Sequence, residues 1–223
     1  MTLNLASYID HTVLKQTTTA SEVDKLCVEA SIAGFVAVCV PPKYVLGAKK
    51  LLDNSKVKVA TVIGFPLGFN ATDIKVKEIQ EAIFMGADEV DMVIDLCALK
   101  SGDWKQLAKE IEACLIPVTA AAKKIKVIVE SGMLTDSEII SCCELYRNYG
   151  IDFMKTSTGY SGVGATVHAV NLMREHLPAH IGIKASGGIR SFAFAKDLID
   201  AGATRIGCSA STQIMREFKE ARK

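Results

Sequence analysis

One transition repeats along the sequence: an amphipathic segment ends at a glycine, and a short apolar strand follows. It occurs in SIAGFVAVCV, IFMGADEVDMV, RNYGIDFM and DAGATRIGC. Glycine is favoured just beyond a helix because it readily adopts the left-handed backbone that ends the helix. We therefore predict left-handed helix ends at Gly34, Gly86, Gly150 and Gly202. Strands that alternate with helices pair in parallel through right-handed crossovers.

Seven apolar, β-branched runs are typical of buried strands, and an eighth near the start is weaker. They are residues 35–40, 58–65, 89–94, 126–131, 151–156, 181–185 and 203–209, with 7–12 as the eighth. Amphipathic helices are predicted between them at 20–33, 70–85, 103–124, 135–149, 166–177, 191–201 and 210–222. Because no G-x-G-x-x-G motif, linker or low-complexity run is present, the pattern favours a closed barrel over an open sheet. We predict an α/β fold, a single-domain (β/α)8 TIM barrel over residues 1–223.

Composition excludes several classes of protein. Lys and Arg number 26 against 25 Asp and Glu, and this balance is not typical of proteins that bind nucleic acid or anionic membranes. No stretch has the roughly 18 apolar residues of a membrane span, and the first residues lack a signal-peptide pattern. Seven cysteines without a C-x-x-C motif argue against a disulfide framework, and Cys142 and Cys143 are predicted to lie on a helix face. We expect a reduced, cytoplasmic enzyme.

Metal chemistry has little support in the sequence. The four histidines show neither H-x-H nor H-E-x-x-H spacing, so we predict no metal site. His168 and His176 fall on one predicted helix, and His11 is expected to have a hydrogen-bonded structural role. A G-x-S-x-G nucleophile motif is also missing.

Two lysines end apolar strands, where a surface residue is not expected. Lys155 follows IDFM and precedes TSTG, and Lys184 follows IGI and precedes ASGG. In a (β/α)8 barrel, the carboxyl ends of the strands and the loops after them form the active site. Alternation along the strand places Asp91 on the same side as Glu89, and Glu89 is left out of the site because it lies at the opposite end. If these sides face the barrel axis, two ammonium groups and one carboxylate converge.

A lysine pair indicates carbonyl chemistry. An ordinary lysine has a pKa of about 10.4, and burial together with a second ammonium group lowers it. The neutral amine attacks a carbonyl to give a Schiff base, and a nearby carboxylate can move protons. The alternatives are that the lysines are surface groups with buried stems, and that Asp91 only neutralises one of them. Lys123, Lys124 and Lys126 are predicted to lie on a solvated helix face.

Glycine-rich segments after the last strands suggest a phosphate site. SGG at 186–188 and GCS at 207–209 follow the two strands whose loops bind phosphate in many such barrels, and STG at 157–159 adds further donors. Backbone N–H groups at a helix start bind anions well. Each segment alone is also a common turn. Arg190 is either a phosphate ligand or an exposed residue at the helix start.

The chain resembles the deoxyribose-phosphate aldolase family in IDHTVLK, VCVPP, ATVIGFPLG, GADEVDMVIDLCALKSGDW, KVIVESGMLTD, DFMKTSTGY, GIKASGGIR and RIGCS. These motifs occur in the family's order over nearly the whole chain. The resemblance implies reversible cleavage of 2-deoxy-D-ribose 5-phosphate to D-glyceraldehyde 3-phosphate and acetaldehyde, in deoxyribonucleoside breakdown and without metal or organic cofactor. It implies that Lys155 forms the Schiff base, that Lys184 lowers the pKa of Lys155, and that Asp91 takes part in proton transfer.

The resemblance also implies the rest of the site. It assigns phosphate binding to Gly159, Gly187, Gly188, Gly207 and Ser209, and the site lining to Asp10, Thr12, Cys39 and Thr158. The chain departs from some members in having Tyr160 in place of a phosphate-binding lysine, Ala210 in place of a second serine, and no tyrosine after Tyr160. A homodimer or homotetramer is the family expectation.

Two rival functions remain open from the sequence. One is another Schiff-base barrel aldolase or a transaldolase-like enzyme that acts on a phosphosugar. The other is a non-catalytic barrel that binds sugar phosphates, in which both lysines are anion ligands.

Overall fold

Eight parallel strands close into a barrel in chain order in the computed structural model, which describes residues 3–222. This arrangement confirms the predicted (β/α)8 fold; residues 1–2 and 223, which the predicted domain also includes, lie outside the described residues. The strands are β1 (Ile9–Thr12), β2 (Ala37–Val40), β3 (Lys58–Ile63), β4 (Glu89–Val93), β5 (Lys124–Ile128), β6 (Phe153–Lys155), β7 (Gly182–Ser186) and β8 (Arg205–Cys208).

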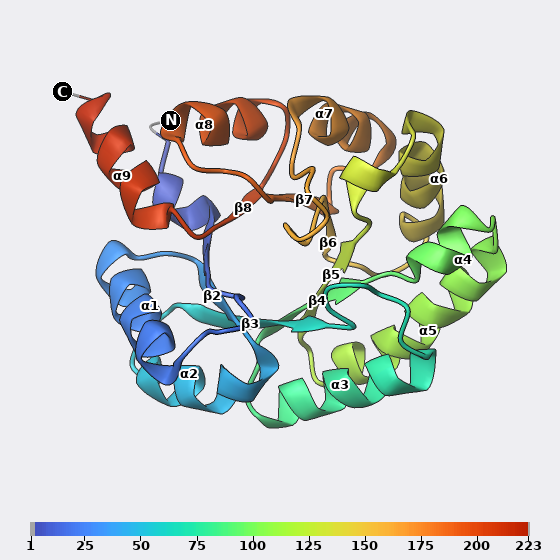
Figure 1. Cartoon of the computed structure of the whole chain (residues 1–223), viewed down its shortest axis with the longest axis horizontal. Helices are drawn as coiled ribbons and strands as arrows, with labels where there is room; N and C mark the ends of the chain where they lie inside the picture. The colour runs from blue at the N-terminus through green and yellow to red at the C-terminus, as the bar shows by residue number, and fades with distance from the viewer. Residues whose placement is uncertain (1–2, 223) are drawn as a thin grey trace.

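Helices form a ring around the barrel (Figure 1). They are α1 (Ala20–Ala33), α2 (Val45–Leu51), α3 (Thr72–Phe84), α4 (Leu96–Lys100), α5 (Trp104–Ala120), α6 (Asp136–Tyr146), α7 (Val167–His176), α8 (Phe192–Asp200) and α9 (Ser211–Glu220), with short 3-10 turns η1 (Leu5–Tyr8), η2 (Pro42–Tyr44) and η3 (Ser131–Met133). The sequence did not predict the short helices α2 and α4. The described part of the chain contains no helix long and apolar enough to cross a membrane.

Three of the four predicted glycine helix ends are left-handed. Gly34, Gly86 and Gly202 have φ values of 69°, 101° and 112°. The prediction for Gly150 is wrong, because its φ is not positive. Helix α6 already ends at Tyr146, several residues earlier, so this glycine does not stop a helix.

Strand β5 begins and ends earlier than predicted. It starts at Lys124, where it pairs with Glu89 of β4, and this register places Lys126 opposite Asp91. The prediction that Lys126 lies on a solvated helix face is therefore wrong: its side chain is fully buried. The strand stops at Ile128, and Glu130 beyond it has a left-handed backbone with φ of 55°.

Alternation along each strand separates two environments. One set of side chains, including Val38, Val90 and Ile183, packs outward in the main hydrophobic core beneath the helices. The intervening side chains point into the barrel, where β2 and β3 contribute a small apolar cluster of Cys39, Ala60 and Val62. The other strands place charged side chains inside. The barrel interior therefore holds ionic groups in a setting shielded from water.

Candidate active site

A cavity of about 620 Å³ opens at the carboxyl ends of the strands. It brings together residues from the loops after β1, β6, β7 and β8, as the sequence predicted. The predicted site residues that line it are Thr12, Lys155, Thr158, Gly159, Lys184, Gly187, Gly188, Gly207 and Ser209. Arg190 also lines it, with an exposed side chain.

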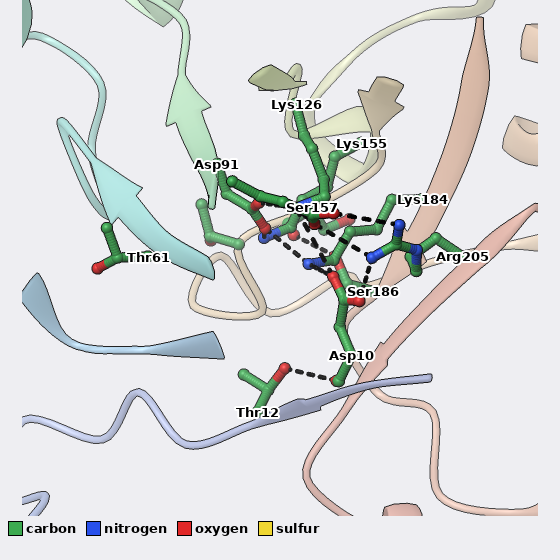
Figure 2. A network of polar contacts seen from close by, with 12 residues as sticks. Asp10, Thr12, Thr61, Asp91, Lys126, Lys155, Ser157, Lys184, Ser186 and Arg205 are labelled. Atoms are coloured by element: carbon green, nitrogen blue, oxygen red, sulfur yellow. Dashed lines mark hydrogen bonds and ion pairs between the residues drawn. The ribbon is translucent and has the colours of Figure 1, made fainter. Parts of the chain in front are cut away.

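Lys155 and Lys184 meet at a single carboxylate oxygen. Oδ2 of Asp91 accepts from Lys155 Nζ at 2.8 Å and from Lys184 Nζ at 2.7 Å (Figure 2). The two nitrogens therefore lie within two hydrogen-bond lengths of each other. Both side chains line the cavity while remaining almost fully buried. The predicted convergence of two ammonium groups and one carboxylate is present.

The other oxygen of Asp91 joins a deeper layer of charges. Lys126 Nζ lies 2.7 Å from Asp91 Oδ1 and 2.6 Å from Glu89 Oε2. Arg205 connects Glu89 to Asp10, with distances of 3.1 and 2.6 Å. Asp10 Oδ2 lies 2.5 Å from Lys184 Nζ, which closes the network.

The charges in this network do not balance when every group is ionised. We define the barrel network as the carboxylates of Asp10, Glu89 and Asp91 with the cations Lys126, Lys155, Lys184 and Arg205. Three carboxylates face four cations, so one positive charge is in excess. Burying an uncompensated charge is unfavourable, and loss of one proton makes the network neutral.

Local contacts decide which lysine loses that proton. Burial lowers the pKa of Lys155, and the Lys184 ammonium acts in the same direction, whereas Asp91 opposes both. Burial also disfavours the charged form of Lys184, but the carboxylates of Asp10 and Asp91 outweigh it and raise the pKa of Lys184. The pKa of Lys126 is likewise raised despite burial, chiefly by Asp91 and Glu89. Lys155 is thus the amine most readily neutral.

Asp91, Asp10 and Cys39 lie behind the cavity wall. None of them lines the cavity, and each is fully buried. The resemblance assigns Asp10 and Cys39 to the site lining, and in the structure they occupy the barrel interior beneath the cavity. Burial raises the pKa of the Cys39 thiol to about 11, so this thiol is neutral at pH 7.

Gly207 leaves room for Lys184. A Cβ atom at this position would lie 2.9 Å from Lys184 Cε and 3.0 Å from Ser186 Cβ. These distances are shorter than ordinary van der Waals contact. A side chain at this position would therefore press on the end of the Lys184 side chain and on Ser186.

Three residues that line the cavity have free backbone donors. The N–H groups of Gly159, Gly188 and Ser209 donate to no other group within residues 3–222. Ser209 precedes helix α9, whose N-cap residue Ala210 provides no side-chain cap. Uncapped helix starts and free N–H groups favour an anion.

Comparison with known proteins identifies the family. Residues 4–213 match the model of the DeoC/LacD family aldolases. The deoxyribose-phosphate aldolase of Thermoanaerobacter sp. (strain X514) is 47% identical over 219 residues, which is 98% of each chain. That of Streptococcus pneumoniae serotype 19F is 48% identical over 214 residues, 96% of each chain. The chain belongs to the DeoC/LacD aldolase family.

A solved structure of this family shares the fold closely. The tetrameric deoxyribose phosphate aldolase from Aeropyrum pernix is 33% identical, with a TM-score of 0.91. The match covers 97% of this chain and 92% of that chain. The resemblance read from the motifs is confirmed.

The resemblance places Tyr160 at the position of a phosphate-binding lysine in some members of the family. Its hydroxyl donates to the carbonyl oxygen of Leu14 at 2.6 Å, and its ring packs edge-on against Phe65. Both Tyr160 and Leu14 line the cavity. The tyrosine therefore joins the loop after β6 to the loop after β1 but brings no positive charge to the cavity.

The histidines take no part in this aldolase site. His11 Nε2 lies 2.8 Å from Glu29 Oε2, and its ring packs against Phe35, which confirms the predicted structural role. His168 lies on the surface, 2.9 Å from Asp136. Within residues 3–222 no group of three or more His, Cys, Asp or Glu side chains is arranged to hold a metal ion.

Sequence reasoning missed two cations of the barrel network. Lys126 lies in the charged run KKIK, which is typical of a solvated surface. Arg205 lies in a predicted strand from which only Gly207 and Ser209 were assigned to the site. Two-residue alternation provides a signal for both: Arg205 shares a side with Gly207, and Lys126 shares a side with Ile128 in β5. Glu89 is also part of the network, although it lies below the site.

Proposed function

We propose that this chain is a deoxyribose-phosphate aldolase. It cleaves 2-deoxy-D-ribose 5-phosphate reversibly to D-glyceraldehyde 3-phosphate and acetaldehyde. The observation that carries the proposal is the pairing of Lys155 and Lys184 on one oxygen of Asp91, at the floor of a cavity with free N–H donors. Relatives that align with nearly the whole chain are named deoxyribose-phosphate aldolase, and these names support the same substrate.

Lys155 is the proposed nucleophile. Its neutral amine attacks C1 of the open-chain sugar, and loss of water from the carbinolamine gives a protonated Schiff base. The C3 hydroxyl then gives up its proton to water as the C2–C3 bond breaks, and the bonding electrons form the C1–C2 double bond of the enamine while the iminium electrons return to nitrogen. The products are glyceraldehyde 3-phosphate and an enamine. Protonation of the enamine at C2 and hydrolysis release acetaldehyde and restore the amine.

Asp91 and Lys184 are proposed to orient the Lys155 amine and to set its pKa. Burial alone favours the neutral form of Asp91, but the three lysines around it lower the pKa of Asp91 strongly. Asp91 therefore stays ionised and orients the amines of Lys155 and Lys184. Lys184 keeps its proton and disfavours a second positive charge on Lys155. Asp91 therefore assists proton movement through its hydrogen bonds rather than by holding a proton of its own.

The phosphate is proposed to bind to the free N–H groups of Gly159, Gly188 and Ser209, three residues that line the cavity. The start of helix α9 adds a favourable dipole. Gly187 and Gly207 shape this wall, and Thr12 and Thr158 are proposed to contact the sugar. With Tyr160 in place of a lysine, backbone donors hold the phosphate with less help from side-chain charge.

Reductive trapping tests the mechanism. The enzyme is incubated with 2-deoxyribose 5-phosphate and sodium borohydride, digested, and analysed by mass spectrometry. We expect an ethyl group on Lys155, and Lys155→Leu should abolish the label. An ethyl group found only on Lys184 would reverse the assigned roles. No labelled lysine under turnover would overturn the Schiff-base mechanism, and the non-catalytic barrel would then be favoured.

A donor panel tests the substrate. Acetaldehyde, dihydroxyacetone phosphate and fructose 6-phosphate are each offered with glyceraldehyde 3-phosphate or a suitable acceptor. The proposal requires acetaldehyde to be the preferred donor. Preference for either ketose would instead indicate a fructose-bisphosphate-type or transaldolase-like enzyme.

We further propose that the enzyme is a cytoplasmic homodimer or homotetramer that serves deoxyribonucleoside breakdown. The Aeropyrum pernix relative is described as tetrameric. Light scattering on the purified protein distinguishes these two assemblies from a monomer.

A further inference from the structure

Glu130 is held in a backbone conformation that non-glycine residues rarely adopt. It follows strand β5, and its φ and ψ are both 55°, in the left-handed region. Side chains are disfavoured there because Cβ approaches the backbone closely. Such residues persist only where surrounding contacts hold them, and they concentrate at functional sites.

The backbone carbonyl of Glu130 accepts from Met133 N at 2.9 Å, and its carboxyl group contacts Thr158. Glu130 is buried, with 2% of the residue exposed. Its Oε2 accepts from Thr158 Oγ1 at 2.5 Å, and both carboxyl oxygens lie 3.2 Å from Thr158 N. Within residues 3–222 this carboxyl group makes no other hydrogen bond or ion pair.

Thr158 connects Glu130 by hydrogen bonds to residues that line the cavity. Its Oγ1 donates to Glu130 and accepts from Tyr160 N at 3.0 Å. The Tyr160 hydroxyl in turn donates to Leu14 O at 2.6 Å. A line of hydrogen bonds therefore runs from the end of β5, through the turn after Lys155, to the loop after β1.

Gly159 lies in the middle of this line, in the turn that Glu130 holds. Its φ is 88°, it lines the cavity, and its N–H is one of the free donors. Because the Thr158 hydroxyl proton is committed to Glu130, Thr158 offers the substrate only an acceptor. The turn can hold its shape without substrate.

We propose that Glu130 is a positioning residue that orients the turn 158–160 toward the phosphorylated substrate. The inference rests on the proposed function, because it concerns the same cavity. Glu130 touches neither amine of the lysine pair and does not line the cavity, so its effect passes through Thr158. Binding of the phosphate-bearing half should depend on it, and the chemistry at Lys155 should not.

Glu130→Gly is the decisive variant. Glycine adopts the left-handed backbone without penalty, so the fold is kept while the carboxyl group is lost. We expect KM for 2-deoxyribose 5-phosphate to rise about tenfold, as for the loss of a hydrogen bond to a buried carboxyl group. The rate of ethyl labelling of Lys155 with acetaldehyde and borohydride should stay within about twofold, because acetaldehyde does not reach the phosphate end.

Glu138→Gln is the matched control. The Glu138 carboxylate also accepts from a threonine: the N–H of Thr135 lies 2.7 Å away and the Thr135 hydroxyl 3.1 Å away. Glu138 belongs to the cap of helix α6, however, and does not line the cavity. It should leave KM unchanged. Glu130→Gln should recover part of the lost affinity, because its amide oxygen can still accept one bond.

Thr158→Val removes the same bond from the other side. The double variant with Glu130→Gly should lose less affinity than the sum of the two single losses, because both changes remove the Thr158 Oγ1–Glu130 bond. An unchanged KM in Glu130→Gly, or an equal loss of acetaldehyde labelling, would overturn the positioning role. If wild-type enzyme itself fails to label Lys155, the proposed function fails instead, so the two failures are distinguishable.

Discussion

Lys155 and Lys184 are register partners on adjacent parallel strands, β6 and β7. Neighbouring strands place such a pair side by side, and the shared alternation points both side chains into the barrel. One oxygen of Asp91 lies between the two lysine nitrogens and accepts from both. The strand register thus creates the electrostatic asymmetry: Lys184 has two carboxylate partners, whereas Lys155 has one.

Removing Lys184 should impair catalysis through the pKa of Lys155. In Lys184→Leu, Asp10 and Asp91 lose a cation and Lys155 loses the repulsion that disfavours its charge. The pKa of Lys155 then rises, and its neutral fraction at pH 7 falls about tenfold for each unit. The pH profile of kcat/KM between about pH 6 and pH 10 should show its rising limb displaced to higher pH.

Lys196→Leu serves as the control for that measurement. Lys196 is exposed and pairs only with Asp200, one turn away on α8. It should leave the profile unchanged. A Lys184→Leu enzyme with the wild-type rate at pH 7 would rule out the charge-coupling argument.

Lys126 should matter for stability as well as activity. In Lys126→Met, Asp91 Oδ1 loses its lysine and Glu89 retains only Arg205. Breaking a buried ion pair by removing one partner costs about 3–5 kcal/mol, and urea unfolding measures it. Adding Glu89→Gln should recover part of this loss, because it removes a buried carboxylate that has lost its lysine partner. Simple additivity of the two changes would contradict a shared network.

The barrel network should also govern stability in acid. Although burial opposes it, neighbouring cations lower the pKa of both Asp10 and Asp91, chiefly Lys184 for Asp10 and Lys126 for Asp91. An aspartate in the unfolded chain titrates near about pH 3.9. Because the folded pKa is the lower one, the stabilisation is complete above about pH 5 and is lost as pH falls through and below about pH 4.

Urea unfolding between about pH 7 and pH 3 tests this dependence. The free energy of unfolding should decline steeply only at the acid end. Asp10→Asn should flatten the decline, because one titrating carboxylate is gone. An equally steep decline in the variant would place the acid sensitivity elsewhere.

The sequence predicted which residues belong to the site better than it predicted how deep in the barrel each side chain lies. Lys155, Lys184 and Asp91 were predictable because period-two alternation and a polar strand end are local signals. That Asp10 and Cys39 lie beneath the cavity was not, because depth along the barrel axis depends on the stagger between strands. The left-handed backbone of Glu130 could not be predicted either, because such a conformation is normally indicated by a glycine and this position has none.

Gly207 provides a test of packing at the lysine pair. A Cβ atom at this position would press on Lys184 Cε and on Ser186 Cβ, and Lys184 is too constrained by Asp10 and Asp91 to yield freely. Gly207→Ala should therefore move the Lys184 ammonium away from Asp91. Small misplacements in an active site have large effects, and we expect kcat/KM to fall by about tenfold or more.

Gly150→Ala is the matched substitution for this test. No atom lies within 4 Å of a Cβ at Gly150, and its φ is not left-handed, so alanine fits without strain. Activity should be unchanged, and stability should rise by about 0.4–1 kcal/mol because the unfolded chain loses freedom. Circular dichroism should show both variants folded. If Gly207→Ala keeps the wild-type kcat/KM and pH profile, the close packing of Lys184 against Gly207 is not what holds its ammonium on Asp91.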